Sequence, residues 1–239
     1  MKFTTEDIKK IRAAISAARV VGVDAMVVAN NRCSGVSDKM NGCIFSDLQL
    51  ESLEGIQMGL SRLGELEKRL MLFGDDIEVT AEVNQDSKVR LLNIKAKSGR
   101  IEFRCTDAKL IKAPKELNDP VIAIGVMDRA EVLQVVKGIL TLSAEKVIMH
   151  VDRAGLLSFE AKDSSNDTFE FKSETPVAFI DEDQSSIVTQ FEASGGVFLK
   201  LLDAASKETD QINFEISATG QVRINHLNHY LIAIPRIDV

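Results

Sequence analysis

The strongest constraint on the fold is an order of predicted elements that occurs twice along the chain. Each half of the 239 residues predicts a helix, short strands, a second helix and closing strands. In the first half the expected helices are 5–18 and 62–73, and the expected strands are 24–29, short segments up to 45, 77–83, 89–96 and 100–105. In the second half the expected helices are 128–139 and 196–206, and the expected strands are 146–151, 156–161, 168–172, 212–217, 222–225 and 230–234.

The first helix of each half also begins in a similar way. Thr5 or Asp7 can cap the helix of the first half, and Asp128 can cap its counterpart. Apolar residues then return at helical spacing and predict one buried face, namely Ile8, Ile11, Ile15 and Ala18 in the first half and Val132, Val135, Val136 and Ile139 in the second. These matching starts favour a duplicated chain, and one undivided α+β domain stays the alternative.

A polar segment separates the two halves. Residues 107–120 contain Pro114 and Pro120 among alternating charges, a composition typical of a connector. We therefore predict an α+β fold made of two similar domains, each with antiparallel sheets and two helices. The first domain is expected at 1–107, the connector at 108–120 and the second domain at 121–239.

An ordinary soluble composition narrows the class of protein. Hydrophobic residues make up 45% of the chain, and no apolar run reaches the roughly 20 residues that span a bilayer. The N-terminal residues lack the apolar core of a signal peptide, and Cys33, Cys43 and Cys105 show no paired spacing. We expect reduced thiols, no membrane partner and a cytoplasmic location. The net charge of −7 argues against a uniformly basic nucleic-acid coat, but not against basic residues gathered on one surface.

The residues that could carry enzyme chemistry do not form a recognisable motif. The sequence has no phosphate-binding glycine loop, no dinucleotide fingerprint and no nucleophile elbow. His226 and His229 are three residues apart, a spacing that places them on opposite faces of a strand. Cys33 and Cys43 are ten apart, and the acidic segment 181–183 fits a solvated turn. We predict a protein without catalytic activity, cofactor or metal.

Four segments point to a known family. They are the helix Ile8–Ile15, the connector Arg104–Pro114, the helix and strand Asp128–Asp152, and the closing run Asn228–Ile237. Together they resemble DNA sliding clamps, whose last strand typically ends in Tyr-Leu-Ala-Pro-Lys/Arg-Ile; here one residue is inserted before Pro235. The length is similar to that of the two-domain, trimeric clamps of eukaryotes, archaea and tailed phages. The unusual stretch 30–47 favours a virus-type clamp, which would act in the cytoplasm of a host cell.

The resemblance implies a function as well as a fold. Subunits of sliding clamps form a ring with helices lining the hole and sheets on the outside. The expected partners are duplex DNA without sequence preference, a DNA polymerase, a clamp loader and two further copies of this chain, so that polymerase stays tethered for processive synthesis. A protein-interaction scaffold with the same two-domain fold, but without ring or DNA, is the alternative.

Basic residues on the four predicted helices are the candidates for contact with DNA. Helices that face a phosphate backbone gain affinity from cations that displace counterions. Solvated faces of amphipathic helices are the alternative, and one Tyr with no Trp argues against stacking on single strands. The candidates are Lys9, Lys10, Arg12, Arg19, Arg62, Lys68, Arg69, Lys137, Lys200 and Lys207.

Two further sets of residues follow from the resemblance. Partner peptides of clamps insert apolar anchors beside the connector and the last strand, where this chain has Leu110, Ile111, Ile232, Ile234 and Pro235. One of Ile232 and Ile234 is expected in the core rather than in contact with a partner. Strands 101–105 and 168–172 are the expected subunit contacts, through Ile101, Phe103, Cys105, Phe169 and Phe171. The alternative is that both strands are internal to their own sheets.

Overall fold

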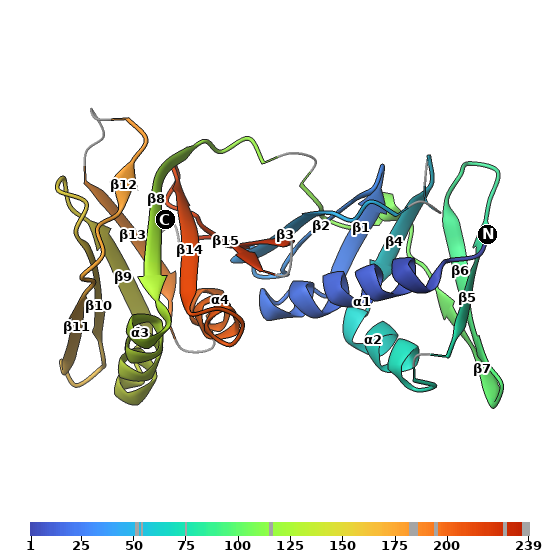
Figure 1. The fold of residues 1–239 in the computed structure, drawn as a ribbon, viewed down its shortest axis with the longest axis horizontal. Coiled ribbons are helices and arrows are strands. Elements are labelled where there is room, and N and C mark those ends of the chain that lie inside the picture. Colours follow the sequence, from blue (N-terminus) through green and yellow to red (C-terminus); the bar gives the residue numbers. More distant parts are fainter. Residues whose placement is uncertain are drawn as a thin grey trace. The chain divides into compact units, whose positions relative to one another are not determined.

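A computed structural model describes residues 1–50, 53, 55–74, 76–114, 117–181, 186–193, 196–226 and 229–235 (Figure 1). The chain divides into two compact units. Unit 1 consists of Met1–Lys39, Cys43–Glu116 and Leu227–His229, and unit 2 consists of Met40–Gly42, Leu117–His226 and Tyr230–Val239. Both units combine helices with antiparallel sheets, so the predicted α+β class is confirmed.

Unit 1 contains two sheets and two α-helices within its described residues. Its elements are α1 (Thr5–Val20), β1 (Ala25–Ala29), β2 (Arg32–Val36), β3 (Gly42–Asp47), β4 (Gln57–Ser61), α2 (Leu63–Met71), β5 (Glu78–Val83), β6 (Val89–Ala96), β7 (Gly99–Arg104) and the 3-10 helix η2 (Ala108–Leu110). The strand orders are β3-β2-β1-β4 and β5-β6-β7. Neighbouring strands are antiparallel.

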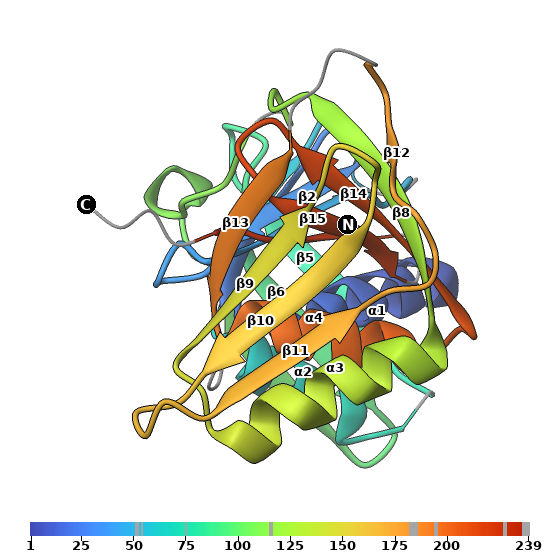
Figure 2. The same ribbon diagram turned by 90° about the vertical axis from the view of Figure 1, so that its left-hand side faces the viewer.

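Unit 2 repeats this plan within its own described residues. Its elements are β8 (Val121–Asp128), α3 (Arg129–Leu142), β9 (Lys146–Val151), β10 (Leu157–Lys162), β11 (Thr168–Lys172), β12 (Ala178–Phe179), β13 (Ile187–Glu192), α4 (Val197–Ser206), β14 (Gln211–Ser217), β15 (Val222–His226) and β16 (His229–Ala233). One sheet has the order β12-β8-β14-β15-β16 and the other β11-β10-β9-β13. Figure 2 shows the second sheet face on, with α3 alongside it.

The N-cap of the first helix is Thr4, one residue before the earlier of the two predicted caps. Its hydroxyl accepts from the Asp7 main-chain N–H, and the Asp7 carboxylate accepts from the Thr4 N–H, both at 3.1 Å. This reciprocal pair satisfies two main-chain donors that the first turn would leave unbonded. Asp7 therefore takes part in the cap from inside the helix. The predicted buried stripe is present, with Ile11 and Ile15 almost fully buried.

The first helix of unit 2 is capped as predicted. Asp128 is the N-cap of α3, and its main-chain N–H donates to Glu131 at 3.1 Å. Val132, Val135, Val136 and Ile139 are buried. The α4 helix adds Phe198 to the same core, where its ring stacks on Phe191 with centroids 4.4 Å apart. Aromatic stacking of this kind adds stability beyond the area that it buries.

Three strands of five or more residues were missing from the sequence prediction. They are β4, β8 and β13, and each forms long stretches of ladder with its neighbours. The β4 segment contains Gly59, which is unusual in a strand interior. A Cβ at Gly59 would lie 2.3 Å from the Thr106 carbonyl oxygen, so only glycine fits this close approach. No helix in the described ranges is long and apolar enough to cross a membrane.

Candidate nucleic-acid and protein interfaces

The basic residues of α1 divide into free and bound side chains. Lys9 is exposed, whereas the Lys10 Nζ donates to the Gln49 carbonyl oxygen at 3.2 Å. Arg19 forms an ion pair with Glu67 of α2, which joins the two helices of unit 1. Arg12 is half-buried. Lys9 is therefore an exposed α1 cation with no ion pair or hydrogen bond to another described side chain.

Arg62 and Arg69 of unit 1 are held against the sheet. Their guanidinium carbons lie 5.0 and 5.4 Å from the ring centroid of Phe103 on β7. Both also pair with Glu65 at 3.3 Å. Arg62 donates to the Arg104 carbonyl oxygen at 3.5 Å, and Arg69 donates to the Glu102 carbonyl oxygen at 3.4 Å. Both arginines were candidates for contact with DNA, and in the structure both join α2 to β7.

The remaining candidate cations show the same division. Lys68 on α2, Lys137 on α3 and Lys200 on α4 are exposed, and none of them forms an ion pair with another described residue. Lys207, which follows α4, pairs with Asp203 at 2.6 Å. Each of the four helices thus presents one lysine that is free of other side chains in the described part of the chain: Lys9, Lys68, Lys137 and Lys200.

The connector covers a cavity of about 760 Å³ on unit 1. Its walls come from β1, β2 and β3 and include Val27, Ser34 and Phe45, and Ile111 and Pro114 line it from the connector. A volume of this size can receive several side chains of a bound peptide. The neighbouring Leu110 is 79% exposed and does not line the cavity.

Asp107 fixes the start of the connector. Its carboxylate accepts from the Lys109 main-chain N–H at 3.1 Å and caps η2. The Lys88 Nζ lies 3.4 Å from both carboxylate oxygens. The Lys109 N–H and then the Lys88 ammonium lower the pKa of Asp107, because both stabilise the charged form. The connector therefore leaves β7 in a defined direction.

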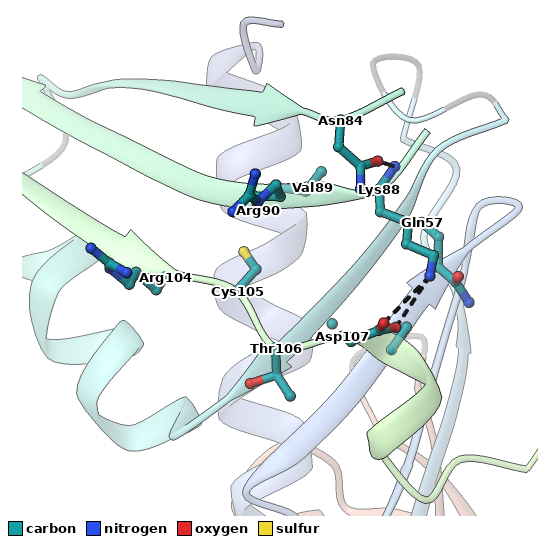
Figure 3. Close-up of a pocket in the computed structure, with 11 residues that line it drawn as sticks. Gln57, Asn84, Lys88, Val89, Arg90, Arg104, Cys105, Thr106 and Asp107 are labelled. Atoms are coloured by element: carbon teal, nitrogen blue, oxygen red, sulfur yellow. Dashed lines mark hydrogen bonds and ion pairs between the residues drawn. The ribbon is translucent and has the colours of Figure 1, made fainter. Parts of the chain in front are cut away.

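A second cavity, of about 270 Å³, lies where β7 runs into the connector (Figure 3). The main-chain N–H of Cys105 donates to the Arg90 carbonyl oxygen, and that of Thr106 donates to the Gly59 carbonyl oxygen, at 2.9 and 3.0 Å. Burial raises the pKa of the Cys105 thiol to about 12, so it is protonated and a poor nucleophile near neutrality. This cavity was not predicted, because its walls come from segments far apart in the sequence.

The last described residues correct one predicted partner contact. Ile232 is 1% exposed and belongs to the core, whereas Ile234 and Pro235 are half-buried. The Ile234 main-chain N–H donates to the Asn41 carbonyl oxygen at 3.0 Å. Ile232 lies inside β16, where Leu231 and Ala233 are also buried, whereas Ile234 follows the last residue of that strand. These residues belong to unit 2, while Leu110 and Ile111 belong to unit 1.

The two predicted subunit strands are both end strands of their sheets, β7 in unit 1 and β11 in unit 2. Phe103 is fully buried and Phe171 is 9% exposed, while Ile101, Cys105 and Phe169 are half-buried. Phe169 packs its ring against Gly138 of α3, where an added Cβ would come within 2.1 Å of the ring. The aromatic side chains therefore pack inside their own units, and the main chain forms each edge.

The two histidines considered for metal binding belong to different units. The His229 Nδ1 lies 2.6 Å from the Ser46 hydroxyl, and the His226 Nε2 lies 4.0 Å from Glu208. The described residues contain no group of three or more side chains that could hold a metal ion. Most of the acidic segment 181–183 lies outside the described residues.

The fold is that of DNA sliding clamps. No model of a known protein family matches the sequence, and no curated protein matches it. Among solved structures, A. fulgidus PCNA with the C-terminal region of FEN-1 bound is 18% identical, with complete coverage of both chains and a TM-score of 0.65. The DNA polymerase sliding clamp of Pseudomonas aeruginosa is 16% identical over 100% of this chain and 66% of that chain, with a TM-score of 0.69. Proliferating Cellular Nuclear Antigen from Entamoeba histolytica is 12% identical over 99% and 98% of the two chains, with a TM-score of 0.64.

Proposed function

We propose that the protein is a sliding clamp, which closes as a homotrimer around duplex DNA and tethers a DNA polymerase for processive synthesis. The observation that carries the proposal is the combination of this fold with one exposed, unpaired lysine on each of the four helices. Each of the three copies would bring these four lysines to the duplex. Weak contacts with phosphates suit sliding, because enclosure replaces tight binding.

The proposed subunit contact joins β7 of one copy to β11 of the next. A head-to-tail contact closes into a ring when its rotation allows closure. End strands also carry unbonded main-chain groups, and pairing them removes a risk of aggregation. The interior of such a ring would be neutral to basic even though the chain carries a net charge of −7.

The proposed site for polymerase and clamp loader is the cavity under the connector. Ile111 and Pro114 offer apolar contacts at its rim, and Phe45 offers one in its wall. Apolar anchors in such pockets supply most of the binding energy of short peptides. We place Leu110, Ile234 and Pro235 among the contacts of a bound partner. The proposed place of action is the cytoplasm, which would be that of a host cell if the clamp is viral.

Threading onto DNA tests this function without a polymerase or a loader. A ring that opens only slowly can pass over a free end of linear duplex, and we expect retention when both ends are blocked with streptavidin afterwards. Blocking the ends before the protein is added should abolish retention. Equal binding in both orders would show ordinary surface contact, and absence of binding would favour a protein-interaction scaffold.

A further inference from the structure

The outer edge of β7 carries the main-chain groups of charged residues. The Cys105 N–H points to β6, because it donates to Arg90, whereas the Thr106 N–H points the other way and donates to Gly59. Main-chain direction alternates along a strand. Ile101 and Phe103 therefore bond toward β6, while the N–H and C=O groups of Glu102 and Arg104 point away from it.

The outer edge of β11 has the same property. The Ser173 N–H donates to the Leu157 carbonyl oxygen at 2.9 Å, toward β10. By alternation Phe169 and Phe171 also bond toward β10, and Glu170 and Lys172 direct their main-chain groups away from it. On both edges, the residues that offer hydrogen bonds to a new strand are those with charged side chains.

Which residues direct their main-chain groups outward decides whether the two edges can pair parallel or antiparallel. In a parallel pair, a residue whose main-chain N–H and C=O groups point at the partner strand stands opposite a residue whose groups point away from it. Glu102 would then stand opposite Phe169 or Phe171, and the charged face of one sheet would continue as the buried face of the other. In an antiparallel pair, residues that point at each other stand opposite, so charged residues meet charged residues. The antiparallel arrangement alone keeps both faces continuous.

Charge then selects one register among those that the alternation allows. With Glu102 opposite Lys172, Arg104 stands opposite Glu170, and both pairs are of opposite sign. A shift of two residues one way sets Glu102 against Glu170 and Arg100 against Lys172. The same shift the other way sets Arg104 against Lys172. A shift of four leaves only one matched pair, Arg100 with Glu170.

The neighbouring strands favour the same register. Glu170 stands directly opposite Glu160 on β10, a like-charge pair that is unfavourable in a single copy. Arg104, Glu170 and Lys172 form no ion pair with another described residue. An arginine opposite Glu170 would relieve the repulsion. On the inner face, Phe103 would then stand beside Phe171 and Cys105 beside Phe169, which extends both apolar layers across the boundary.

We propose that β7 of one copy pairs antiparallel with β11 of a second copy, with Glu102 opposite Lys172 and Arg104 opposite Glu170. This register rests on the proposed function, because it assumes assembly of identical chains. It assigns four charged side chains as the contacts that fix the alignment of subunits: Glu102, Arg104, Glu170 and Lys172.

Paired cysteines test the register directly. In a Cys105→Ser background, Arg104→Cys with Glu170→Cys places two thiols opposite each other, within the Cα separation that a disulfide spans. Mild oxidation should then give covalent trimers in denaturing gels without reductant. Two matched controls, Glu102→Cys with Glu170→Cys and Arg100→Cys with Glu170→Cys, report the shifted registers and should cross-link at least tenfold more slowly.

Charge reversal provides a second measurement that needs no oxidation. Arg104→Glu and Glu170→Arg should each weaken assembly in native mass spectrometry, and the two together should restore it. Glu145→Arg, an exposed reversal elsewhere on unit 2, should leave assembly unchanged. A trimer that cross-links best through a control pair overturns the register and leaves the clamp function standing. A chain that stays monomeric and never cross-links overturns the register and the proposed assembly together.

Discussion

The guanidinium carbon of Arg62 lies 5.0 Å from the ring centroid of Phe103, and this contact joins the beginning of α2 to β7. Arg62 is also the N-cap of the helix, in a left-handed conformation with a φ of 55°. A non-glycine residue in this region costs energy that its surroundings must offset. Stacking on Phe103 and the ion pair with Glu65 supply part of that offset.

Truncation of Phe103 should therefore destabilise unit 1 strongly. Phe103→Ala should lower the free energy of unfolding by about 3–5 kcal/mol, because it leaves a cavity and removes the surface on which two arginines stack. Urea denaturation followed by circular dichroism measures the change. Phe103→Leu, which keeps most of the volume but not the ring, should cost less. A Phe103→Leu variant as stable as the wild type would show that the stacking contributes nothing.

The four unpaired lysines should set the salt dependence of DNA binding. Replacing Lys9, Lys68, Lys137 and Lys200 by Ala should weaken association with duplex DNA and flatten its dependence on salt. The slope should fall by about one for each phosphate that the variant no longer neutralises. A control with the same change in charge replaces Lys2, Lys95, Lys97 and Lys162, which lie on strands, turns or the N-terminus. If both quadruple variants bind alike, the helices do not face DNA.

The connector cavity should be needed for partner peptides. Ile111→Asp and Pro114→Asp, both at residues that line the cavity, should each reduce the affinity of a polymerase C-terminal peptide at least tenfold, about 1.4 kcal/mol, because a carboxylate would enter an apolar contact. Fluorescence anisotropy with a labelled peptide measures the affinity, and native mass spectrometry checks that assembly persists. Val188→Asp is the matched control, since Val188 is 67% exposed on β13 and does not line the cavity. Unchanged affinity in both site variants would remove the cavity from the proposal.

The buried thiols should resist alkylation in the folded protein. Burial raises the pKa of Cys33 and of Cys105 to about 12. Because a raised pKa leaves the thiol protonated below that value, the reactive thiolate is scarce at pH 8 and becomes abundant only as the pH approaches 12. Mass spectrometry after iodoacetamide treatment at pH 8 should show slow labelling of both, and rapid labelling in urea. Fast labelling of Cys105 in the native protein would mean that the cavity beside it opens readily.

The sequence predicted the elements whose signals are local. Helical spacing located α1 and α3, and Asp128 marked the start of α3 correctly. The β4 strand was not predicted because a glycine interrupts a short segment. The β8 and β13 strands were not predicted because they lie between segments with stronger signals. The roles of Arg62 and Arg69 could not be foreseen, because their partner Phe103 is distant in the sequence and only the folded sheet brings it under α2. Strand alternation could not separate Ile232 from Ile234, because residues two apart share a face, and the end of β16 at Ala233 distinguishes them.

Gly138, in the middle of α3, lowers the stability of the helix but leaves room for the Phe169 ring. Alanine at position 138 would favour the helix by up to about 1 kcal/mol, and a protein engineer who wanted a more heat-resistant variant would try it first. The Phe169 ring, however, occupies the space that a methyl group would need. The substitution would push the ring, and with it the edge strand, away from the helix. In the trimer that we propose, a gain in the stability of one chain would then be obtained at the expense of its fit to the next.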